Sequence, residues 1–448
     1  MICKIKKHLF LFCKILLGLT IFLGIILVYF IHSAFVVPTS RLGMDRYYPE
    51  MPPDEKHHYL TLPIDHNDKS RGQFKGFYIL SPNFRIGDEV IFFLTDGQME
   101  LVDTEPYFPL FENLLPELSY VLIFVRGQSP TLFPEVYRKD GGINYKEALN
   151  LYGSDQQIED IEAVRADMLK KGMIHSDGKI MLLGASGAGV LAQQYISKYG
   201  RNVSKAILEV TGAPDLSTLN KISYSRDLEN YDSSVFREYE QVVEKKRANS
   251  AELSYLLYNL ARISIDGPAK QLQMLQDLNA GKSMDYWKFW FNPQCNLMIC
   301  KNLLSLPTGV AAKVRWWELV GGELRRYSKA GRKPINLLYE FSLEVLAEFI
   351  SGGDSGEIES KCFRIERASY EGEILIISGN EDVVFSPEIG RILSKEYKNS
   401  KLASIKDGHR MLVSKEYLKQ LRKTFFLGGF RSGDFLNAYR NEKQLNKE

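Results

Sequence analysis

A serine lies within a run of very small residues that follows an apolar segment. Residues 179–183 read KIMLL, and residues 184–189 read GASGAG. A strand, a sharp turn around a serine and a helix would expose the hydroxyl at the carboxyl edge of a sheet. Gly184 and Ala188 must be small there, because side chains two residues before and after Ser186 would collide. The pattern predicts Ser186 as a nucleophile, with the Gly187 amide at the helix start free to bind an oxyanion.

A nucleophilic serine needs a base and an orienting acid, which such a sheet supplies in the chain order Ser, Asp or Glu, His. After Ser186 the sequence contains a single histidine, His409, just past the last apolar strand. Asp382 follows the apolar residues 374–378 in a Gly-x-x-Asp spacing, and its neighbour Glu381 is the alternative. We predict a triad of Ser186, His409 and Asp382 that performs acyl transfer.

A second oxyanion donor normally comes from the loop after the third strand. Residues 94–99, LTDGQM, occupy that position. The backbone amide of Gln98 is therefore the candidate, and Gly97 would permit close approach. The alternative is a plain β-turn built on Asp96 and Gly97.

The letters GASGAG also read G-x-x-G-x-G, which is close to a dinucleotide-binding turn, and Glu209 ends the next strand where a ribose-binding acid could lie. A dinucleotide-binding unit usually begins its domain and continues with further β-α repeats. Here the turn follows four candidate strands and precedes a long helical segment. This order favours the nucleophile, and no cofactor is expected.

Short apolar runs alternate with helical patterns, which predicts an α/β fold with a largely parallel sheet. A capping box at Ser154–Gln157 and an apolar stripe predict a surface helix that ends at Gly172, and a second helix should run over about 187–198 and close at Gly200. Eight strands are expected, near Tyr59–Ile64, Phe74–Leu80, Val90–Thr95, Tyr120–Val125, Lys179–Leu183, Lys205–Val210, Glu373–Ser378 and Leu402–Lys406.

The spacing changes over residues 212–372, where no clear strand occurs and the period is helical at Leu253–Ile263, Pro268–Leu278 and Ile335–Ile350. We interpret this segment as a helical cap inserted between the sixth and seventh strands. Residues 57–211 and 373–430 then form the core, and residues 431–448 form a polar C-terminal tail.

Residues 125–130, VRGQSP, follow the fourth strand. With the serine turn, they resemble the R-G-x-G-x-S turn of α/β hydrolases related to prolyl and tripeptidyl aminopeptidases, over roughly residues 57–212 and 370–425. The resemblance implies the α/β-hydrolase fold with a helical cap, and a role for Arg126 in stabilising loops around the site. It also implies that cap carboxylates, here Glu318 or Glu323, bind the free ammonium of a peptide substrate.

All four tryptophans fall in the cap: Trp287, Trp290, Trp316 and Trp317. They could line an apolar substrate pocket, although packing within the cap is the usual role of such residues.

Residues 15–37 carry no charged side chain and are long enough to cross a bilayer as a helix. Four lysines, at positions 4, 6, 7 and 14, precede this stretch. The positive-inside rule therefore predicts a cytoplasmic N-terminus and an extracytoplasmic catalytic domain. The apolar stretch is long for a cleaved signal peptide, so we interpret 1–37 as an uncleaved anchor, with secretion after cleavage as the alternative. Residues 38–56 form a linker with four prolines.

The chain has 448 residues and a formal net charge of +2, without a basic block, which excludes the electrostatic footprint of a nucleic-acid binder. Five cysteines without a C-x-x-C pair and seven histidines without H-E-x-x-H predict no metal site. Only Cys295, Cys300 and Cys362 follow the apolar stretch, so a monomer can form at most one disulfide on the oxidising side.

The sequence thus predicts an exported or membrane-anchored serine hydrolase that acts on a peptide or another small molecule. An amide bond is the preferred target, and a carboxylesterase or lipase is the alternative. A non-catalytic binding module on the same fold is the alternative of another class, and its expected mark would be an incomplete triad.

Overall fold

Eight short apolar segments form one sheet in the computed structural model of the chain. The structure describes residues 14–28, 55–99, 101–102, 106–128, 132–138, 142–290 and 309–445. Strands β3 and β4 are buried along their whole length, as expected for strands covered on both faces. The strands are β1 (His57–Pro63), β2 (Gln73–Leu80), β3 (Ile91–Leu94), β4 (Tyr120–Ile123), β5 (Ile180–Ala185), β6 (Val203–Glu209), β7 (Glu373–Gly379) and β8 (Ser400–Ile405).

The strand order is β1-β2-β4-β3-β5-β6-β7-β8. β2 runs antiparallel to both of its neighbours, and the remaining pairs are parallel. All eight expected strands are present, with bounds that differ by a few residues. The carboxyl ends of β5, β7 and β8 lie at one edge of the sheet because these strands are parallel. The chain has the α/β-hydrolase fold, as the sequence predicts.

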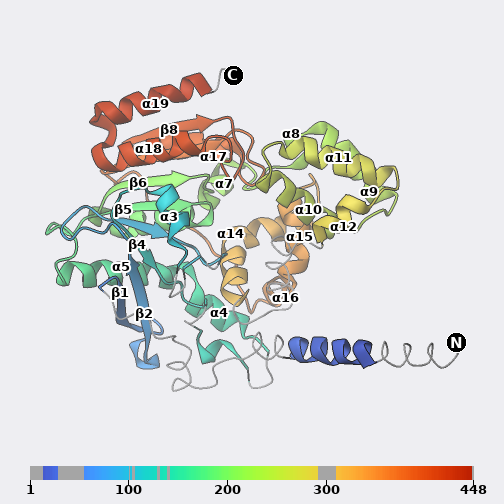
Figure 1. Cartoon of the computed structure of the whole chain (residues 1–448), viewed down its shortest axis with the longest axis horizontal. Coiled ribbons are helices and arrows are strands. Elements are labelled where there is room, and N and C mark those ends of the chain that lie inside the picture. The colour runs from blue at the N-terminus through green and yellow to red at the C-terminus, as the bar shows by residue number, and fades with distance from the viewer. Residues whose placement is uncertain are drawn as a thin grey trace, which may run out of the picture.

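Helices from the segments that connect and follow the strands cover this sheet (Figure 1). α5 and α6 pack against each other, and α6 contacts β3, β5 and β6, while α17 contacts β7 and β8. The helices are α3 (Phe108–Leu114), α4 (Tyr145–Tyr152), α5 (Ser154–Lys170), α6 (Gly187–Tyr199), α17 (Pro387–Glu396) and α18 (Lys415–Gly428), with short 3₁₀ helices at Lys69–Arg71, Pro134–Val136, Gly200–Asn202 and Gly429–Arg431. Gly172, where the first predicted helix should stop, has a φ of 68°, the left-handed conformation that glycine favours.

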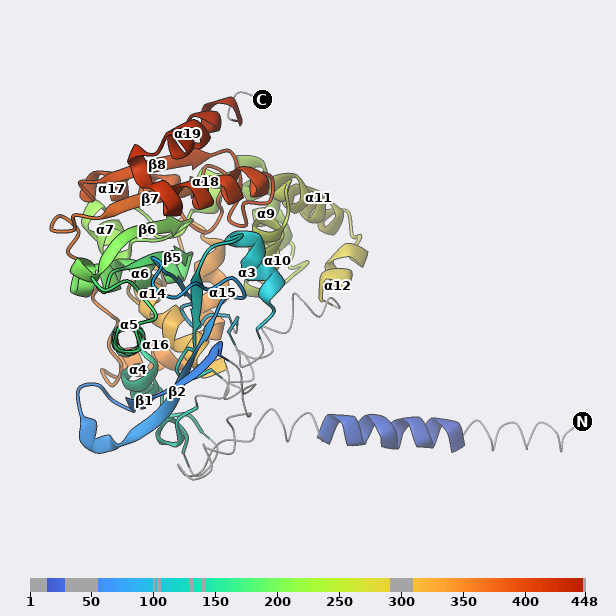
Figure 2. The ribbon, with the colours of Figure 1, turned by 60° about the vertical axis from the view of Figure 1, so that its left-hand side comes forward.

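The segment between β6 and β7 is helical wherever the structure describes regular elements in it. Figures 1 and 2 show α9, α11 and α12 in a lobe beside the sheet, with α10, α14 and α15 nearer to it. The period over Ile335–Ile350 predicts one helix, but the chain forms two, which meet at Leu346. The cap helices are α7 (Pro214–Asn220), α8 (Leu228–Tyr231), α9 (Ser233–Glu244), α10 (Ser250–Ile263), α11 (Gly267–Asn279), α12 (Met284–Trp290), α14 (Val310–Lys329), α15 (Leu337–Val345) and α16 (Ala347–Asp354).

The C-terminal residues expected as a polar tail contain a helix, α19 (Gly433–Leu445). It packs on α18, where the Phe435 ring is fully buried against Phe425. The Tyr439 hydroxyl donates a hydrogen bond to the Leu402 carbonyl of β8 at 2.6 Å. α19 therefore belongs to the packed core.

Residues 14–28 form a helix within the predicted anchor. Among the helices of the described residues, none combines the length and apolar character that a bilayer crossing requires. Most of residues 29–56, with the end of the predicted anchor and the linker, lies outside the described residues, as do Cys295 and Cys300. Cys362 is an exposed free thiol. The anchor stays a prediction.

Candidate active site

Ser186 lies in the turn that joins β5 to α6. Its backbone has φ 55° and ψ −127°, a conformation that non-glycine residues rarely adopt. Three hydrogen bonds hold Ser186 in this turn: its amide donates to the Glu209 carbonyl at 2.9 Å, and its carbonyl accepts from the Gly189 amide at 3.0 Å and from the Thr211 hydroxyl at 3.1 Å. This strained strand-to-helix turn is the geometry expected of a nucleophile elbow.

The small residues of the elbow are required by close backbone contacts. A Cβ atom on Gly184 would collide with the Ala188 carbonyl, and one on Gly189 would collide with Thr211. A Cβ atom on Gly187 would strike the side chains of Asp96 and Gln98, which approach from the loop after β3.

The structure brings Ser186, His409 and Asp382 together from the ends of three parallel strands. His409 Nε2 lies 3.1 Å from Ser186 Oγ, and His409 Nδ1 lies 2.9 Å from Asp382 Oδ2. The tautomer that satisfies both bonds carries its proton on Nδ1, so Nε2 accepts from the serine hydroxyl. Asp382 and His409 are buried, whereas Glu381, the alternative acid, is exposed.

Backbone amides hold the Asp382 carboxylate in place. Its Oδ1 accepts hydrogen bonds from the amides of Val384 at 2.7 Å and Phe385 at 3.3 Å, which leaves Oδ2 for the imidazole. The Phe385 ring also contacts the imidazole, with 5.6 Å between ring centroids.

Asp407 holds the loop that carries His409, a role that the sequence analysis missed. Its buried carboxylate accepts hydrogen bonds from four backbone amides, those of Gly408, Leu412, Val413 and Ser414. An Asp that precedes Gly in a turn is a sequence signal for such side-chain-to-backbone bonding.

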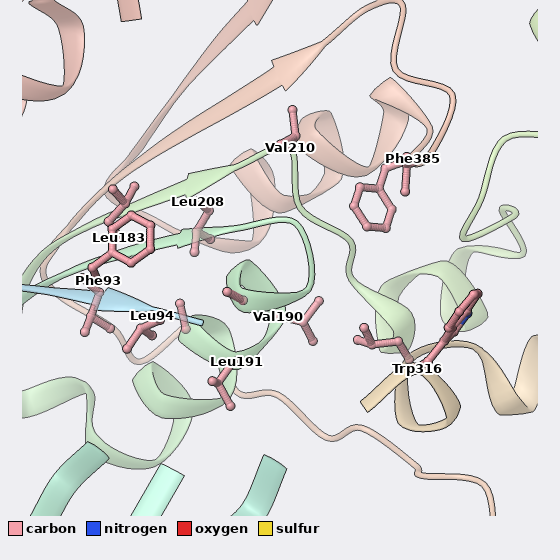
Figure 3. Close-up of a cluster of buried hydrophobic side chains, with 14 of the residues drawn as sticks. Phe93, Leu94, Leu183, Val190, Leu191, Leu208, Val210, Trp316 and Phe385 are labelled. Carbon is pink, nitrogen blue, oxygen red and sulfur yellow. The ribbon is translucent and has the colours of Figure 1, made fainter. Parts of the chain in front are cut away.

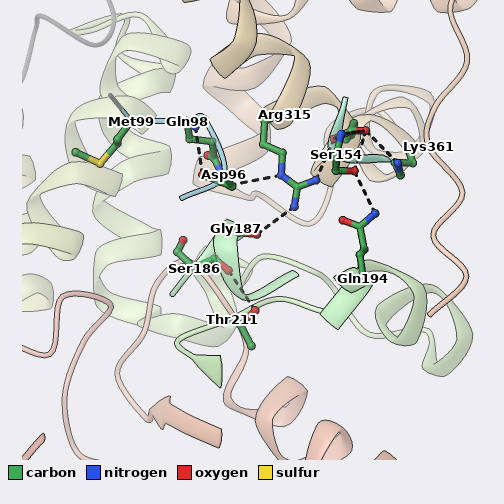
Figure 4. Close-up of polar contacts among 12 residues, drawn as sticks. Asp96, Gln98, Met99, Ser154, Ser186, Gly187, Gln194, Thr211, Arg315 and Lys361 are labelled. Carbon is green, nitrogen blue, oxygen red and sulfur yellow. Dashed lines mark hydrogen bonds and ion pairs between the residues drawn. The ribbon is translucent and has the colours of Figure 1, made fainter. Parts of the chain in front are cut away.

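The loop after β3 lies beside the elbow (Figure 4). Gly97 has a φ of 89°, and Gln128 Nε2 holds the loop by donating to the carbonyls of Gly97 at 2.9 Å and Met99 at 3.0 Å. The Gln98 amide, however, donates to Asp96 Oδ1 at 3.2 Å, and the Gln98 side chain donates to Asp96 Oδ2 at 2.6 Å. Within the described part of the chain the Gly187 amide has no hydrogen-bond acceptor, so of the two predicted oxyanion donors only this one is free to bind a ligand.

Arg126 lies away from the reacting groups. Its fully buried guanidinium forms a two-pronged ion pair with Asp160, at 2.6 and 2.7 Å, and donates to the carbonyls of Ile64 and Leu151 at 2.9 Å. Arg126 therefore ties the end of β1 to α4 and α5, and the role in stabilising loops around the site that the resemblance implies stays a prediction.

A cap arginine reaches the elbow from α14 (Figure 4). Arg315 is buried, and its Nη2 donates to the Gly187 carbonyl at 3.1 Å. Its Nη1 donates to Glu318 at 3.0 Å, and its Nε lies 3.6 Å from Asp96 Oδ2. The sequence gives no signal for this contact of Arg315, because an arginine in a helical segment is usually solvated.

The capping box predicted at Ser154 is wrong. Gly153 is the N-cap of α5, and Ser154 is the first helical residue. The Ser154 amide and hydroxyl donate to the Glu318 carboxylate at 3.1 Å, so a side chain from the cap satisfies this helix start. Lys361 also pairs with Glu318, at 3.2 Å.

Neither cap carboxylate proposed for ammonium binding faces the site. Glu318 is buried among Arg315, Lys361 and Ser154, and Glu323 pairs with Arg326. Neither residue lines the cavity that contains Ser186.

An apolar cavity of about 480 Å³ opens above Ser186 and His409. Its wall combines residues of the loop after β3, the cap and the loops after β7 and β8. The cap contributes five aromatic side chains among the described residues, and the Phe385 ring from the loop after β7 contacts one of them, Tyr224, at 5.1 Å between centroids. The five are Tyr224, Tyr255, Tyr258, Trp316 and Phe341. Figure 3 shows Trp316 and Phe385 at one end of a buried cluster that continues through Val190 and Leu191 of α6 to Phe93 and Leu183 of the sheet.

The four tryptophans divide between the two expected roles. Trp316 lines the cavity, whereas Trp317 is fully buried against Phe349. Trp290 stacks on Tyr255 within the cap, and Trp287 is exposed.

Tyr224 brings a further polar group to the cavity. Its buried hydroxyl has no hydrogen-bond partner among the described residues, and burial raises its pKa well above 10. Tyr224 therefore remains a protonated hydrogen-bond donor at neutral pH.

No family model matches the chain, and no curated protein matches it. Solved structures do align with it. They include a serine hydrolase from Cycloclasticus zankles, with 11% identity and a TM-score of 0.39 over 84% of this chain and 100% of that one. A probable hydrolytic enzyme from Pseudomonas aeruginosa has 12% identity and a TM-score of 0.41 over 86% and 97%. An esterase from Exiguobacterium antarcticum has 15% identity and a TM-score of 0.37 over 79% and 96%. The likeness concerns the fold alone.

Proposed function

We propose that the protein is a serine hydrolase that cleaves an acyl bond, with Ser186 as the nucleophile. The observation that carries the proposal is the chain of contacts from Ser186 Oγ to His409 at 3.1 Å and from His409 to Asp382 at 2.9 Å. A non-catalytic module would have no need of a strained serine turn aligned with both partners.

In the proposed reaction, Ser186 Oγ attacks the acyl carbonyl while His409 Nε2 takes the serine proton. Asp382 holds the imidazole and stabilises its charged form. His409 then returns the proton to the leaving group, and water resolves the acyl-enzyme by the same steps in reverse.

The developing oxyanion would accept a hydrogen bond from the Gly187 amide. A second bond from the Gln98 amide requires that this amide leaves Asp96 Oδ1, which holds it at 3.2 Å. That bond is long for a charge-assisted contact, so the exchange costs little.

The cavity supports an ester with an apolar acyl group as the substrate class. An aminopeptidase of the resembled type needs a carboxylate that faces the substrate ammonium, and both expected cap carboxylates are engaged elsewhere. An apolar wall instead suits an acyl chain or an aromatic acyl group.

A fluorophosphonate probe tests the proposal on the full chain. We expect Ser186→Ala and His409→Ala to abolish labelling, and Ser355→Ala, which changes an exposed cap serine, to label like the wild type. Labelling of folded Ser186→Ala at the wild-type rate, or no labelling of the folded wild type, would contradict the proposal. The kcat/KM values for para-nitrophenyl esters and for aminoacyl anilides then compare ester cleavage with amide cleavage.

A further inference from the structure

The charged side chains that line the cavity are unevenly paired. Among the described residues, two carboxylates line it, and both have arginine partners. Glu209 receives two hydrogen bonds from Arg422, at 2.8 and 2.7 Å. Asp96 accepts from Gln98 and faces Arg315. Neither acid therefore has a free charge to offer to a cationic substrate.

Two arginines of the cavity wall have no carboxylate partner among the residues that the structure describes. Arg262 lies in the last turn of α10. Its Nη2 donates to Asn259 Oδ1 at 3.1 Å, and its buried Nε has no hydrogen-bond partner in the described ranges. Arg410 directly follows His409 and is exposed at the rim. Within the described part of the chain, neither forms an ion pair, and Lys415, also exposed on this wall, forms none either.

The guanidinium groups of Arg262 and Arg410 repel each other. Although the Arg410 side chain is exposed as a whole, desolvation of its guanidinium by the surrounding protein, together with the Arg262 charge, lowers the pKa of Arg410 below its ordinary value. Both positive charges oppose the effect of burial on the pKa of the Tyr258 hydroxyl. The Arg262 guanidinium lies 5.8 Å from the centre of the Tyr258 ring. The C-terminal end of α10 stabilises one cation. This helix end does not explain why Arg410, a second cation without a carboxylate partner among the described residues, lies at the same cavity.

We propose that the cavity binds an acyl substrate that carries a free carboxylate, and that Arg262 and Arg410 bind this group. The inference rests on the proposed hydrolase function and adds the substrate class to it. An anion beside the two guanidinium groups would accept hydrogen bonds from them and offset the repulsion between the two arginines. Guanidinium groups match a carboxylate with paired hydrogen bonds, and the aromatic wall takes the chain between carboxylate and ester.

The test compares matched ester pairs. The para-nitrophenyl hemiesters of adipate, suberate and sebacate keep a free carboxylate, and the corresponding methyl-capped diesters have the same chain without the charge. We expect wild-type kcat/KM to be about tenfold or more higher for the free acid of at least one chain length. Added salt should reduce this ratio, since the subsite opens to solvent at Arg410.

The double variant Arg262→Gln, Arg410→Gln should bring the free-acid to capped-ester ratio close to one. Arg431→Gln, which changes an exposed arginine outside the cavity, should keep the wild-type ratio. Equal kcat/KM for both members of every pair in the wild type, or an unchanged ratio in the folded double variant, would overturn this inference alone. Absence of Ser186-dependent turnover of any ester would overturn the hydrolase function and the inference with it.

Discussion

Arg315 connects the cap to the elbow, and its replacement by methionine should affect both stability and turnover. The Arg315 side chain is 1% exposed, and its guanidinium contacts the Gly187 carbonyl, Glu318 and Asp96. Methionine keeps an apolar stem of similar length but removes the charge and every donor. The variant leaves the Asp96 carboxylate buried beside Gly187 without a cationic partner among these contacts.

Removing one member of a buried ion pair costs about 3–5 kcal/mol. Glu318 keeps Lys361 and Ser154 as partners, so we expect Arg315→Met to lose about 3 kcal/mol, at the lower end of that range. With an unfolding entropy of about 2.1 cal/mol/K per residue, this loss lowers the Tm of a 448-residue chain by about 3 °C. The uncompensated Asp96 charge would also oppose the developing oxyanion and reduce kcat by roughly 10- to 100-fold.

A double-mutant cycle with Asp96→Asn separates the two effects. If Arg315 balances the Asp96 charge, the double variant should recover about 1–3 kcal/mol of the lost transition-state stabilisation. Arg326→Met, on the exposed face of the same helix, should change stability by less than about 0.5 kcal/mol. Kinetics on a para-nitrophenyl ester and thermal unfolding give both quantities. The reasoning would be refuted if Arg315→Met lost no more free energy of unfolding than Arg326→Met. It would also be refuted if Asp96→Asn left the kcat defect of Arg315→Met unchanged.

Four further changes have defined outcomes. Asp382→Asn should lower kcat on the order of 10⁴-fold with the fold intact, and a loss below tenfold would remove Asp382 from the triad. Gly187→Ala should be inactive, because its Cβ would collide with the Asp96 and Gln98 side chains; full probe labelling would contradict this. Tyr224→Phe should unfold at the same denaturant concentration as the wild type or a higher one, because it removes a buried hydroxyl that has no described partner. Burial lowers the pKa of Lys313 below its ordinary 10.5, so between the two pKa values the unfolded chain binds more protons and wild-type stability rises with pH. The free energy of unfolding of Lys313→Met, measured with urea at neutral and alkaline pH, should lack this rise. The same pH dependence in the variant and the wild type would contradict the assignment to Lys313.

Local chemistry made the elbow predictable from the sequence. A turn between a buried strand and a helix, with the serine at positive φ, leaves no room for side chains at Gly184 or Gly189, so the composition of residues 184–189 already implies its shape. His409 and Asp382 were identifiable because parallel strands place their carboxyl ends at one edge. Each residue follows such a strand in the required chain order.

Only the tertiary structure decided which distant charges meet. Ser154 illustrates this: its local sequence favours a capping box, but Glu318, 164 residues away, supplies a carboxylate to the helix start, and Gly153 takes the N-cap position. Arg315 and Arg262 lie in amphipathic helices where a solvated position is the ordinary expectation. The docking of the cap buries Arg315 against the elbow and turns Arg262 toward the cavity. The nucleophile can thus be predicted from the sequence, because adjacent residues form its turn. The charge of the substrate pocket cannot, because it depends on contacts between distant segments that only folding brings together.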